Sequence, residues 1–259
     1  MNNLDQTDTI RYHRQLILKD IGVEGQLKLK SAKVCVCGAG GLGSPILYYL
    51  AAAGVGTLGI VDYDVVKLSN LNRQILHSSD DLETYKTLSA NEKLSRLNPN
   101  IKINEHRIEL SSENIEEIFN QYDVIVDAVD TIKVRYLISD TCYKLKKPLI
   151  EGAVVGMSGI LTTIIPDQTP CYRCLYPFNN ESNEYPTCNE IGILGAITGV
   201  IGSLQALEVI KLITGSGECL LGRLLTFEGL DCEFNEIPII HNKDCVLCGK
   251  NKRGCNEIE

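Results

Sequence analysis

Residues 33–43 have the sequence Lys-Val-Cys-Val-Cys-Gly-Ala-Gly-Gly-Leu-Gly. The first five residues form a short apolar run typical of a buried strand, and the rest form a G-x-G-x-x-G turn. Ser44-Pro45 then predicts a helix with an N-cap and a first-turn proline, and Gly54 is placed to close it. Residues 58–62 predict a second buried strand. We therefore expect a right-handed strand–helix–strand unit.

The alternation of strands and helices continues along the chain. Helices are predicted over residues 10–30, 84–97 and 134–145, strands over 101–108, 124–126, 148–151 and 159–165, and a loop over 176–190. This order indicates the α/β class, with a Rossmann-like, mostly parallel sheet flanked by helices and antiparallel strands late in the chain.

The composition argues against some classes of protein. The 259 residues carry a net charge of −8, whereas a protein that binds nucleic acid normally presents a basic face. Residues 191–213 are apolar, but Gln205, Glu208 and Lys211 favour a buried helix over a membrane span. The N-terminus has no signal-peptide pattern, so we expect a cytoplasmic protein whose 11 cysteines stay reduced.

The glycine turn predicts a site for a phosphate group. Its glycines are Gly38, Gly40, Gly41 and Gly43. They let the backbone approach an anion, and the following helix offers free N–H groups and the positive end of its dipole. Asp62, 19 residues after Gly43, is placed to accept hydrogen bonds from a ribose, and Asp130 ends a later strand in the same way. An ordinary aspartate at a strand end is the alternative for Asp62.

Basic residues distinguish two interpretations of this site. A nicotinamide-dependent dehydrogenase needs little more than backbone N–H groups for its two phosphates. A triphosphate that is cleaved needs fixed cations and usually magnesium. Arg73, Lys86 and Arg14 are candidates for the cations, and Asp130 offers oxygen ligands to Mg²⁺. Each basic residue alone would more often be a solvated surface residue, so their arrangement around one glycine turn favours ATP.

Two C-x-x-C pairs predict a zinc site. Cys171 and Cys174 form the first pair, and Cys245 and Cys248 form the second. Four thiolates close a tetrahedral coordination shell, so the metal is expected to be structural. A redox dithiol is the alternative, but two copies of the motif favour zinc. Such a site would tie the end of the chain to its middle.

Other candidate residues give weaker signals. Cys188 lies before a predicted helix, where it is either a nucleophile or an incidental thiol. Cys35, Cys37 and Cys142 are expected to be small core residues. The four histidines, His13, His77, His106 and His241, form no visible cluster, and no catalytic role is assigned to them.

In combination these features resemble the MoeB/ThiF/HesA family of adenylyltransferases, relatives of the ubiquitin-activating enzymes. The resemblance covers about residues 11–248. Besides the glycine turn, it is carried by residues 11–15 (Arg-Tyr-His-Arg-Gln), 62–64 (Asp-Tyr-Asp), 69–74 (Ser-Asn-Leu-Asn-Arg-Gln), Lys86, 127–130, 170–177 and 245–248.

The resemblance implies a reaction on a small ubiquitin-fold sulfur carrier protein that ends in Gly-Gly. The terminal carboxylate would attack the α-phosphate of ATP, giving an acyl-adenylate and pyrophosphate. Sulfur transfer from a donor protein would follow, in molybdopterin or thiamine biosynthesis. A carboxylate is already a nucleophile near neutral pH, so positioning and charge neutralisation suffice for catalysis.

The resemblance also implies roles for individual residues. Asp62 would hold the ribose, Asn70, Arg73 and Lys86 the phosphates, and Asp130 the magnesium ion. Arg14 would reach the active site of a neighbouring subunit, which implies a homodimer. Cys188 matches a loop cysteine that some members link covalently to the carrier. Thr131 and Asp140 stand where the family often has Asn, and both are expected near the phosphates and the metal.

These implications define the expected organisation and its alternatives. Residues 1–170 are expected to form the ATP-binding, Rossmann-like part, and residues 171–259 a zinc-braced, carrier-binding part of one continuous domain. One alternative is a sister enzyme that activates a tRNA base or a peptide. The others are the dehydrogenase and a non-enzymatic scaffold that binds a ubiquitin-like protein. No membrane or nucleic-acid partner is expected.

Overall fold

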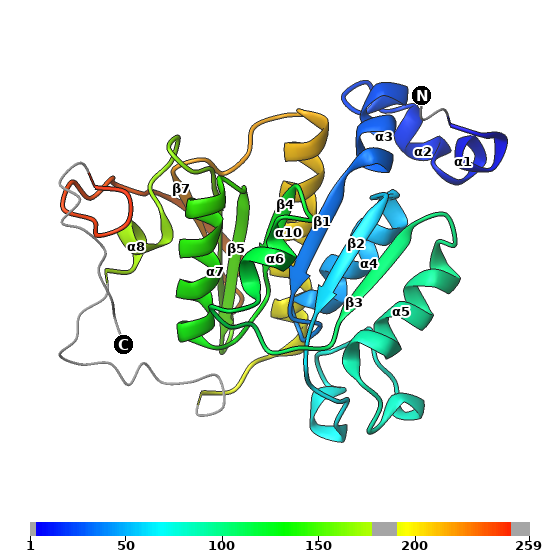
Figure 1. Cartoon of the computed structure of the whole chain (residues 1–259), viewed down its shortest axis with the longest axis horizontal. Coiled ribbons are helices and arrows are strands. Elements are labelled where there is room, and N and C mark those ends of the chain that lie inside the picture. The colour runs from blue at the N-terminus through cyan, green and yellow to red at the C-terminus, as the bar shows by residue number, and fades with distance from the viewer. Residues whose placement is uncertain (1–3, 178–190, 250–259) are drawn as a thin grey trace.

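The computed structural model describes residues 4–177 and 191–249, whose strands form one sheet (Figure 1). The strands are β1 (Lys33–Cys37), β2 (Thr57–Val61), β3 (Lys102–His106), β4 (Val124–Asp127), β5 (Leu149–Val155), β6 (Ser158–Ile164), β7 (Arg223–Glu228) and β8 (Glu233–Pro238). Their order is β3-β2-β1-β4-β5-β6-β7-β8. The pairs from β3 to β5 are parallel and those from β5 to β8 antiparallel. The predicted fold class is confirmed.

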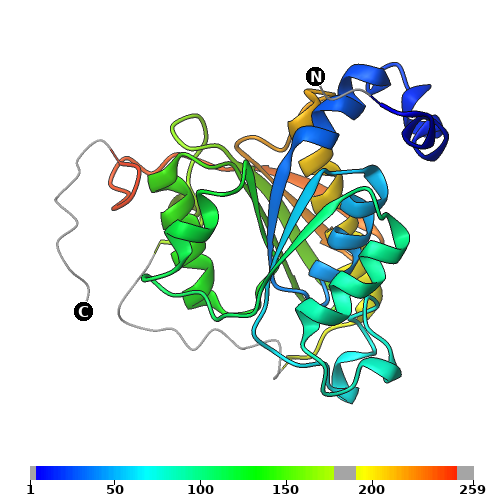
Figure 2. The ribbon, with the colours of Figure 1, turned by 45° about the vertical axis from the view of Figure 1, so that its right-hand side comes forward.

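Helices cover both faces of the sheet (Figure 2). The helices of the described residues are α1 (Gln6–Arg11), α2 (His13–Leu16), α3 (Gly22–Ser31), α4 (Gly43–Ala53), α5 (Lys86–Leu97), α6 (Ile115–Phe119), α7 (Ile132–Leu145), α8 (Tyr172–Leu175) and α10 (Gly195–Thr214), with 3₁₀ turns η1 (Leu68–Asn70) and η2 (Ser79–Asp81). Helices α4, α5 and α10 lie on one face, and α6 and α7 on the other.

Strand β1 contributes to two separate cores. Val34 and Val36 belong to the core beneath α4 and α10, whereas Cys35 and Cys37 belong to the core beneath α6 and α7. Successive side chains of a strand point to opposite faces, so a central strand needs apolar residues at every position. Cys142 of α7 is buried in the second core. The prediction that these three cysteines are core residues is confirmed.

Helix α4 begins and ends close to the predicted points. It starts at Gly43 with Leu42 as the flanking residue, so the prediction of Ser44 as the N-cap is wrong. The Ser44 hydroxyl instead donates to the Gly40 carbonyl at 2.7 Å. Gly54 ends the helix with a φ of 85°, a conformation that favours glycine.

The N-terminal segment is not the single helix predicted over residues 10–30. It is divided into α1, α2 and α3. Tyr12, between the first two helices, is buried and accepts a hydrogen bond from Asn98 at 2.8 Å. Gly22 opens α3 with a φ of 56°. Anchoring the Tyr12 side chain therefore interrupts the helical path.

Helix α10 is long and apolar enough to cross a membrane by length and composition alone. In the structure it packs against α4, α3, β5 and β6. Its Glu208 carboxylate is buried and accepts from the Thr163 hydroxyl at 2.6 Å and from the Leu220 N–H at 2.7 Å. Gln205 donates to the Asp127 carbonyl at 2.7 Å. These polar residues lie in the protein core, as expected for a buried helix.

Candidate functional site

A pocket of about 460 Å³ opens where strands β1, β2 and β4 end. Seven predicted site residues line it: Gly38, Gly40, Gly41, Asp62, Arg73, Lys86 and Asp130. Apolar side chains from the segments after β3 and β4, including Ile108, Leu110 and Val134, complete the wall. The carboxyl ends of parallel strands are the usual place for ligands in open α/β sheets.

Three of the four glycines in the turn, Gly38, Gly41 and Gly43, leave little or no room for a side chain, whereas Gly40 does not. Gly38 has a φ of 101°, and a Cβ atom there would lie 2.7 Å from the Ala128 carbonyl oxygen. A Cβ atom at Gly43 would lie 1.9 Å from the Gly38 carbonyl oxygen, and one at Gly41 would lie 3.0 Å from Thr198. Gly38 thus permits the turn, and Gly43, which does not line the pocket, permits close packing of the helix start.

Asp62 and Lys86 form a connected pair on the pocket wall. One Asp62 oxygen accepts the Ala39 N–H at 2.8 Å, and the other accepts the Asp64 N–H at 2.9 Å. The Lys86 ammonium group is 2.8 Å from the Asp64 carboxylate and 4.0 Å from that of Asp62. Lys86 is only 5% exposed, so its charge is fixed in place.

Asn70 is the last residue of η1, Arg73 follows three residues later, and the two side chains differ in position. The Arg73 guanidinium donates to the Ser69 carbonyl at 3.1 Å and lines the pocket. The Asn70 side chain does not line the pocket; its oxygen accepts the Lys67 N–H at 3.1 Å. Asn70 therefore caps the 3₁₀ turn that directly precedes the segment of Arg73.

Asp130 lies on the pocket rim, above a buried charge cluster that the sequence did not reveal. Arg135 lines the pocket floor and donates to Glu151 at 2.5 Å; its contact with Asp127 is 3.8 Å. Burial and the neighbouring Asp127 raise the pKa of Glu151 well above its usual value. Arg135 also donates to the Val129 carbonyl, so it anchors the segment that presents Asp130.

His77 was assigned no role from the sequence, yet it lies directly behind the glycine turn. Its ring is 6% exposed, with Nε2 2.9 Å from the Ala39 carbonyl oxygen and Nδ1 2.8 Å from the Ser89 hydroxyl. Burial lowers the pKa of His77. The sequence did offer one signal of a functional role for His77, its position close after residues 69–74. The spacing of the histidines alone does not reveal a partner 38 residues away.

Among the predicted catalytic residues that the structure describes, Arg14 is not brought to this pocket. Arg14 is exposed on α2, whose neighbour Gln15 donates to the Ala53 carbonyl at the far end of α4. The glycine turn lies at the start of this 11-residue helix, about 16 Å away by helix geometry. Arg14 therefore does not line the pocket of its own chain. Cys188 lies outside the described residues.

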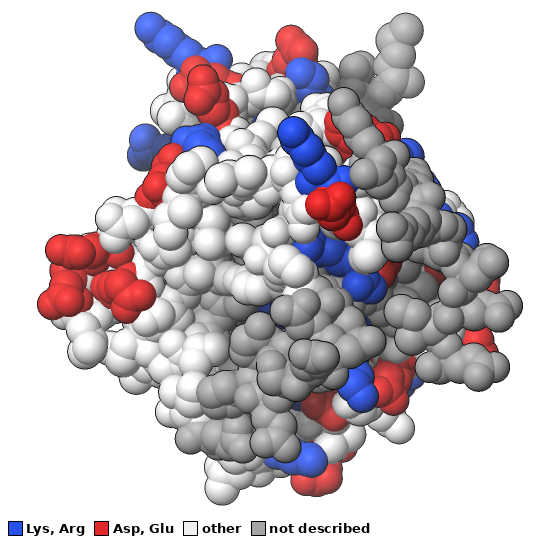
Figure 3. All heavy atoms as spheres, turned by 90° about the vertical axis from the view of Figure 1, so that its left-hand side faces the viewer, with Lys and Arg blue, Asp and Glu red and all other residues white. Residues whose placement is uncertain are grey.

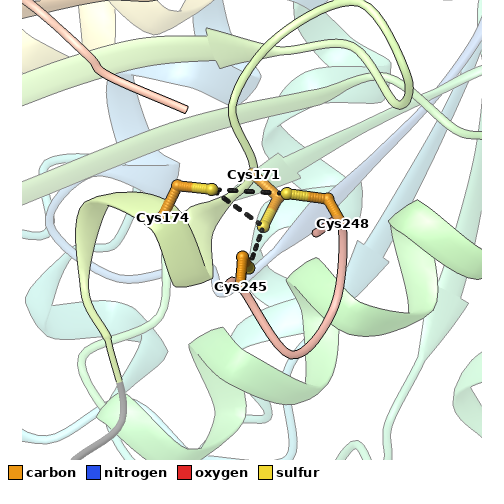
Figure 4. Close-up of side chains that lie close together, drawn as sticks. All are labelled: Cys171, Cys174, Cys245 and Cys248. Carbon is orange, nitrogen blue, oxygen red and sulfur yellow. Dashed lines mark hydrogen bonds between the residues drawn. The ribbon is translucent and has the colours of Figure 1, made fainter. Parts of the chain in front are cut away.

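The four predicted metal ligands come together at α8 and the segment around residues 242–249 (Figure 4). Their sulfur atoms all lie within 4.8 Å of one another. The Cys171–Cys245 distance is 3.5 Å, Cys174–Cys248 is 3.3 Å and Cys171–Cys174 is 3.9 Å. Tetrahedral zinc with bonds of about 2.3 Å separates its sulfur ligands by about 3.8 Å. The four thiols therefore fit a zinc ion.

Asp140 supports this cluster and does not line the pocket. The predicted placement of Asp140 near the phosphates is wrong, whereas Thr131 does line the pocket. The single N–H of the Arg173 Nε donates a bifurcated hydrogen bond to the two Asp140 carboxylate oxygens, at 2.9 and 3.1 Å, and Nη2 donates a second bond at 2.7 Å. Arg173 lies within the first C-x-x-C pair and its guanidinium stacks 4.9 Å from the Tyr136 ring centre.

Comparison with known proteins gives consistent matches over nearly the whole chain. Residues 12–248 match the model of the ThiF family. The chain is 48% identical over 252 residues to "Adenylyltransferase and sulfurtransferase MOCS3" of Culex quinquefasciatus, covering 97% of this chain and 58% of that protein. The protein of the same name from Xenopus laevis is 45% identical over 246 residues, covering 95% and 54%. The chain thus spans little more than half the length of these relatives.

Solved structures share the fold. E. coli MccB, crystallised with AMPCPP and MccA, superposes with a TM-score of 0.82 at 26% identity, covering 92% of this chain and 74% of that one. The MccB structure with MccA-N7isoASN gives a TM-score of 0.82 at 25% identity, covering 92% and 75%.

Proposed function

The chain belongs to the ThiF family, and from this we propose that it uses ATP to adenylate the C-terminal glycine carboxylate of a small ubiquitin-like sulfur carrier protein. The observation that supports this most directly is the single pocket in which the glycine turn, Asp62, Arg73, Lys86 and Asp130 lie together. The similar proteins from Culex and Xenopus are named adenylyltransferases, and MccB was crystallised with AMPCPP.

In the proposed reaction a carboxylate oxygen of the carrier attacks the α-phosphorus of ATP. The bond between that phosphorus and the bridging oxygen to the β-phosphate breaks, and pyrophosphate leaves. The turn and the start of α4 would bind phosphates, and Asp62 the ribose. Lys86 and Arg73 would neutralise the charge that accumulates on the leaving group. Asn70 would act indirectly, because it caps the 3₁₀ turn that precedes Arg73.

The charges of the pocket favour two further components. Lys86 is paired with Asp64 and Arg135 with Glu151, so among the described pocket residues Arg73 is the one cation without a carboxylate partner. A triphosphate carries about four negative charges, more than one arginine can neutralise. The exposed Asp130 carboxylate is a suitable ligand for Mg²⁺, which when bound would screen phosphate charge. Arg14 of a second copy would supply another cation, in a homodimer.

The cysteine cluster is proposed to hold structural zinc through Cys171, Cys174, Cys245 and Cys248. Four sulfur ligands leave no open coordination position, so the ion would not take part in the reaction. We propose that residues 1–170 form the ATP-binding part and residues 171–259 the zinc-braced, carrier-binding part. If Cys188 has a role, it would act in this second part as a thiol near the carrier tail.

The setting of the proposed reaction is the cytoplasm, because the nine described cysteines are all free thiols. A sulfur donor protein would act on the adenylate, in molybdopterin biosynthesis or, second, in thiamine biosynthesis. Nucleic acid is not a proposed partner. On the face shown in Figure 3 the described basic side chains are interspersed with acidic ones and form no continuous basic surface.

The test is carrier-dependent exchange of labelled pyrophosphate into ATP. We expect exchange with a Gly-Gly-ending carrier from the same genome and none when that tail is removed. Arg73→Ala and Asp130→Ala should each lower exchange at least about 100-fold with zinc content unchanged. Arg96→Ala, an exposed arginine at the far end of α5, is the control. Absence of exchange with every such carrier would refute the proposal.

A second candidate is favoured by the MccB structures, which were solved with MccA. A sister enzyme of the same fold would activate the end of a different polypeptide. The two candidates differ in the substrate that supports exchange: the first requires a folded carrier, and the second would accept a short peptide. The 48% identity to the Culex protein favours the carrier.

A further inference from the structure

His77 determines how one peptide group of the glycine turn is oriented. The Ala39 carbonyl oxygen can only accept a hydrogen bond, so the Nε2 atom 2.9 Å away must carry the ring proton. In the neutral ring Nδ1 is then an acceptor, and the Ser89 hydroxyl donates to it at 2.8 Å. Ser89 accepts in turn from the Lys93 ammonium group at 2.9 Å. The direction of each of these three hydrogen bonds, from Lys93 through Ser89 and His77 to Ala39, is therefore fixed.

The same residue of the turn is held from its other side. The Ala39 N–H donates to Asp62 at 2.8 Å, and its carbonyl accepts from His77, while Ala39 itself is fully buried. The peptide between Ala39 and Gly40 is trans, so its carbonyl and its N–H point in opposite directions. With the carbonyl directed inward at His77, the Gly40 N–H is directed away from the protein interior.

The Gly40 N–H is placed to receive a ligand. Gly40 lines the pocket, and its N–H has no acceptor within residues 4–177 and 191–249. Its own carbonyl is already engaged by the Ser44 N–H and hydroxyl. A free backbone N–H beside a helix start is a favourable donor to a phosphate oxygen.

We propose that His77 is a positioning residue for nucleotide binding: by holding the Ala39 carbonyl, it directs the Gly40 N–H at a phosphate of the bound nucleotide. This inference rests on the proposed use of ATP but not on the identity of the carrier. His77 itself does not line the pocket. It acts through the peptide that it orients.

Binding of AMPCPP with magnesium, measured by titration calorimetry, tests the inference without any carrier. His77→Phe keeps a ring but loses the donor, and we expect about 10- to 100-fold weaker binding, the loss of one hydrogen bond to a charged group. His77→Gln places an amide N–H near the former Nε2 position and should bind within about threefold of the unaltered protein. His106→Gln is the matched control, because that ring contacts the Tyr122 hydroxyl at 2.7 Å and not the turn.

Two results would overturn the inference: His77→Phe binding as tightly as the unaltered protein, or His77→Gln binding as weakly as His77→Phe. In pyrophosphate exchange, the KM for ATP should rise in His77→Phe while kcat changes little. Should His77→Phe fail to fold, ¹⁵N-glycine labelling of the unaltered protein decides: AMPCPP must shift the Gly40 amide resonance. If AMPCPP binds and leaves that resonance unmoved, the inference fails while the proposed function stands.

Discussion

Asp81 carries a buried negative charge that supports the helix bearing Lys86. Its carboxylate accepts from the Lys93 ammonium group and from both the N–H and the hydroxyl of Ser78, the latter two at 2.6 and 2.8 Å. Burial alone would raise the pKa of Asp81, but these hydrogen bonds outweigh it and lower the pKa to about 2. The charged pair therefore fixes η2 against α5.

This lowered pKa predicts a pH-dependent contribution to stability. The folded protein holds the Asp81 proton less tightly than the unfolded chain does, so the pair stabilises the fold above about pH 4, and this contribution is lost as the pH falls through about 2. Lys93→Met should cost about 1–2 kcal/mol in urea unfolding at pH 7, and less at pH 3. Lys144→Met, which removes an exposed pair with Glu116, should have little effect. A cost in Lys93→Met that is the same at both pH values would contradict this account.

Single residues differ in how far their positions follow from the sequence. Asp62 and three of the four glycines, Gly38, Gly40 and Gly41, could be placed on one pocket because strand ends and turns have local signatures. His77 and Arg135 could not, because each acts on a backbone carbonyl of a different segment, and such contacts leave no pattern in side-chain type. The ion pair of Asp140 with Arg173 was missed for another reason: the two residues are 33 positions apart, and opposite charges at that separation do not by themselves indicate a contact.

Helix α10 contains glycines with opposite surroundings. A Cβ atom at Gly202 would lie 2.5 Å from Pro45 and 2.7 Å from the Leu42 carbonyl oxygen, both at the start of α4. A Cβ atom at Gly199 would meet nothing within 4 Å. Gly202 therefore permits the close approach of the two helices that bring Thr198 to the glycine turn.

These surroundings predict opposite effects of the same substitution. Gly199→Ala should raise the free energy of unfolding by about 0.5–1 kcal/mol, because alanine restricts the unfolded chain and favours the helix. Gly202→Ala should lower it by about 1–3 kcal/mol, because the helices must separate. Chemical denaturation of both variants checks this. Equal effects would mean that α4 and α10 do not pack as described.

The cysteine cluster joins α8 to a segment more than 60 residues later in the chain. If zinc closes this junction, Cys171→Ser should lose the ion and lower the melting temperature, since closed zinc sites contribute folding free energy. Zinc content by mass spectrometry and calorimetric melting measure the two effects. Cys232→Ser, which alters an exposed free thiol, is the control. An unchanged melting temperature in Cys171→Ser would argue against a structural metal.

Secondary structure was predictable where a continuous apolar run was bounded by turn residues. The buried strands β1, β2 and β4 are continuous apolar runs between turn residues, and the structure places them within a residue or two of the prediction. The N-terminal helices were not separable by sequence, because their breaks depend on Tyr12 packing beneath Gly54 and Asn98. Tertiary contacts of this kind override a periodic pattern.

Across the whole molecule, one sheet joins the two proposed parts of the chain. Strand β6, which precedes residue 170, pairs with β7, which follows it. The pocket and the cysteine cluster are thus built on one sheet, with α7 contributing Arg135 to the first and Asp140 to the second. Helix α2, which carries the exposed Arg14, lies apart from both, beside α1 and α3 (Figure 1).

This separation predicts complementation between two inactive variants. If Arg14 acts in the pocket of a second copy, Arg14→Ala and Arg73→Ala should each abolish exchange in a homodimer. In a mixed dimer one pocket carries both defects and the other carries neither, because the two residues come from different chains. Random pairing of equal amounts makes half of the dimers mixed, so about a quarter of all pockets are intact. Unfolding and refolding the two variants together should therefore restore about a quarter of the unaltered activity.

Mixing Arg73→Ala with Asp130→Ala is the control. Both side chains line the pocket of their own chain, so every pocket of a mixed dimer carries one of the two defects. No activity should return in this mixture. No recovery with Arg14→Ala and Arg73→Ala would place Arg14 outside the active site.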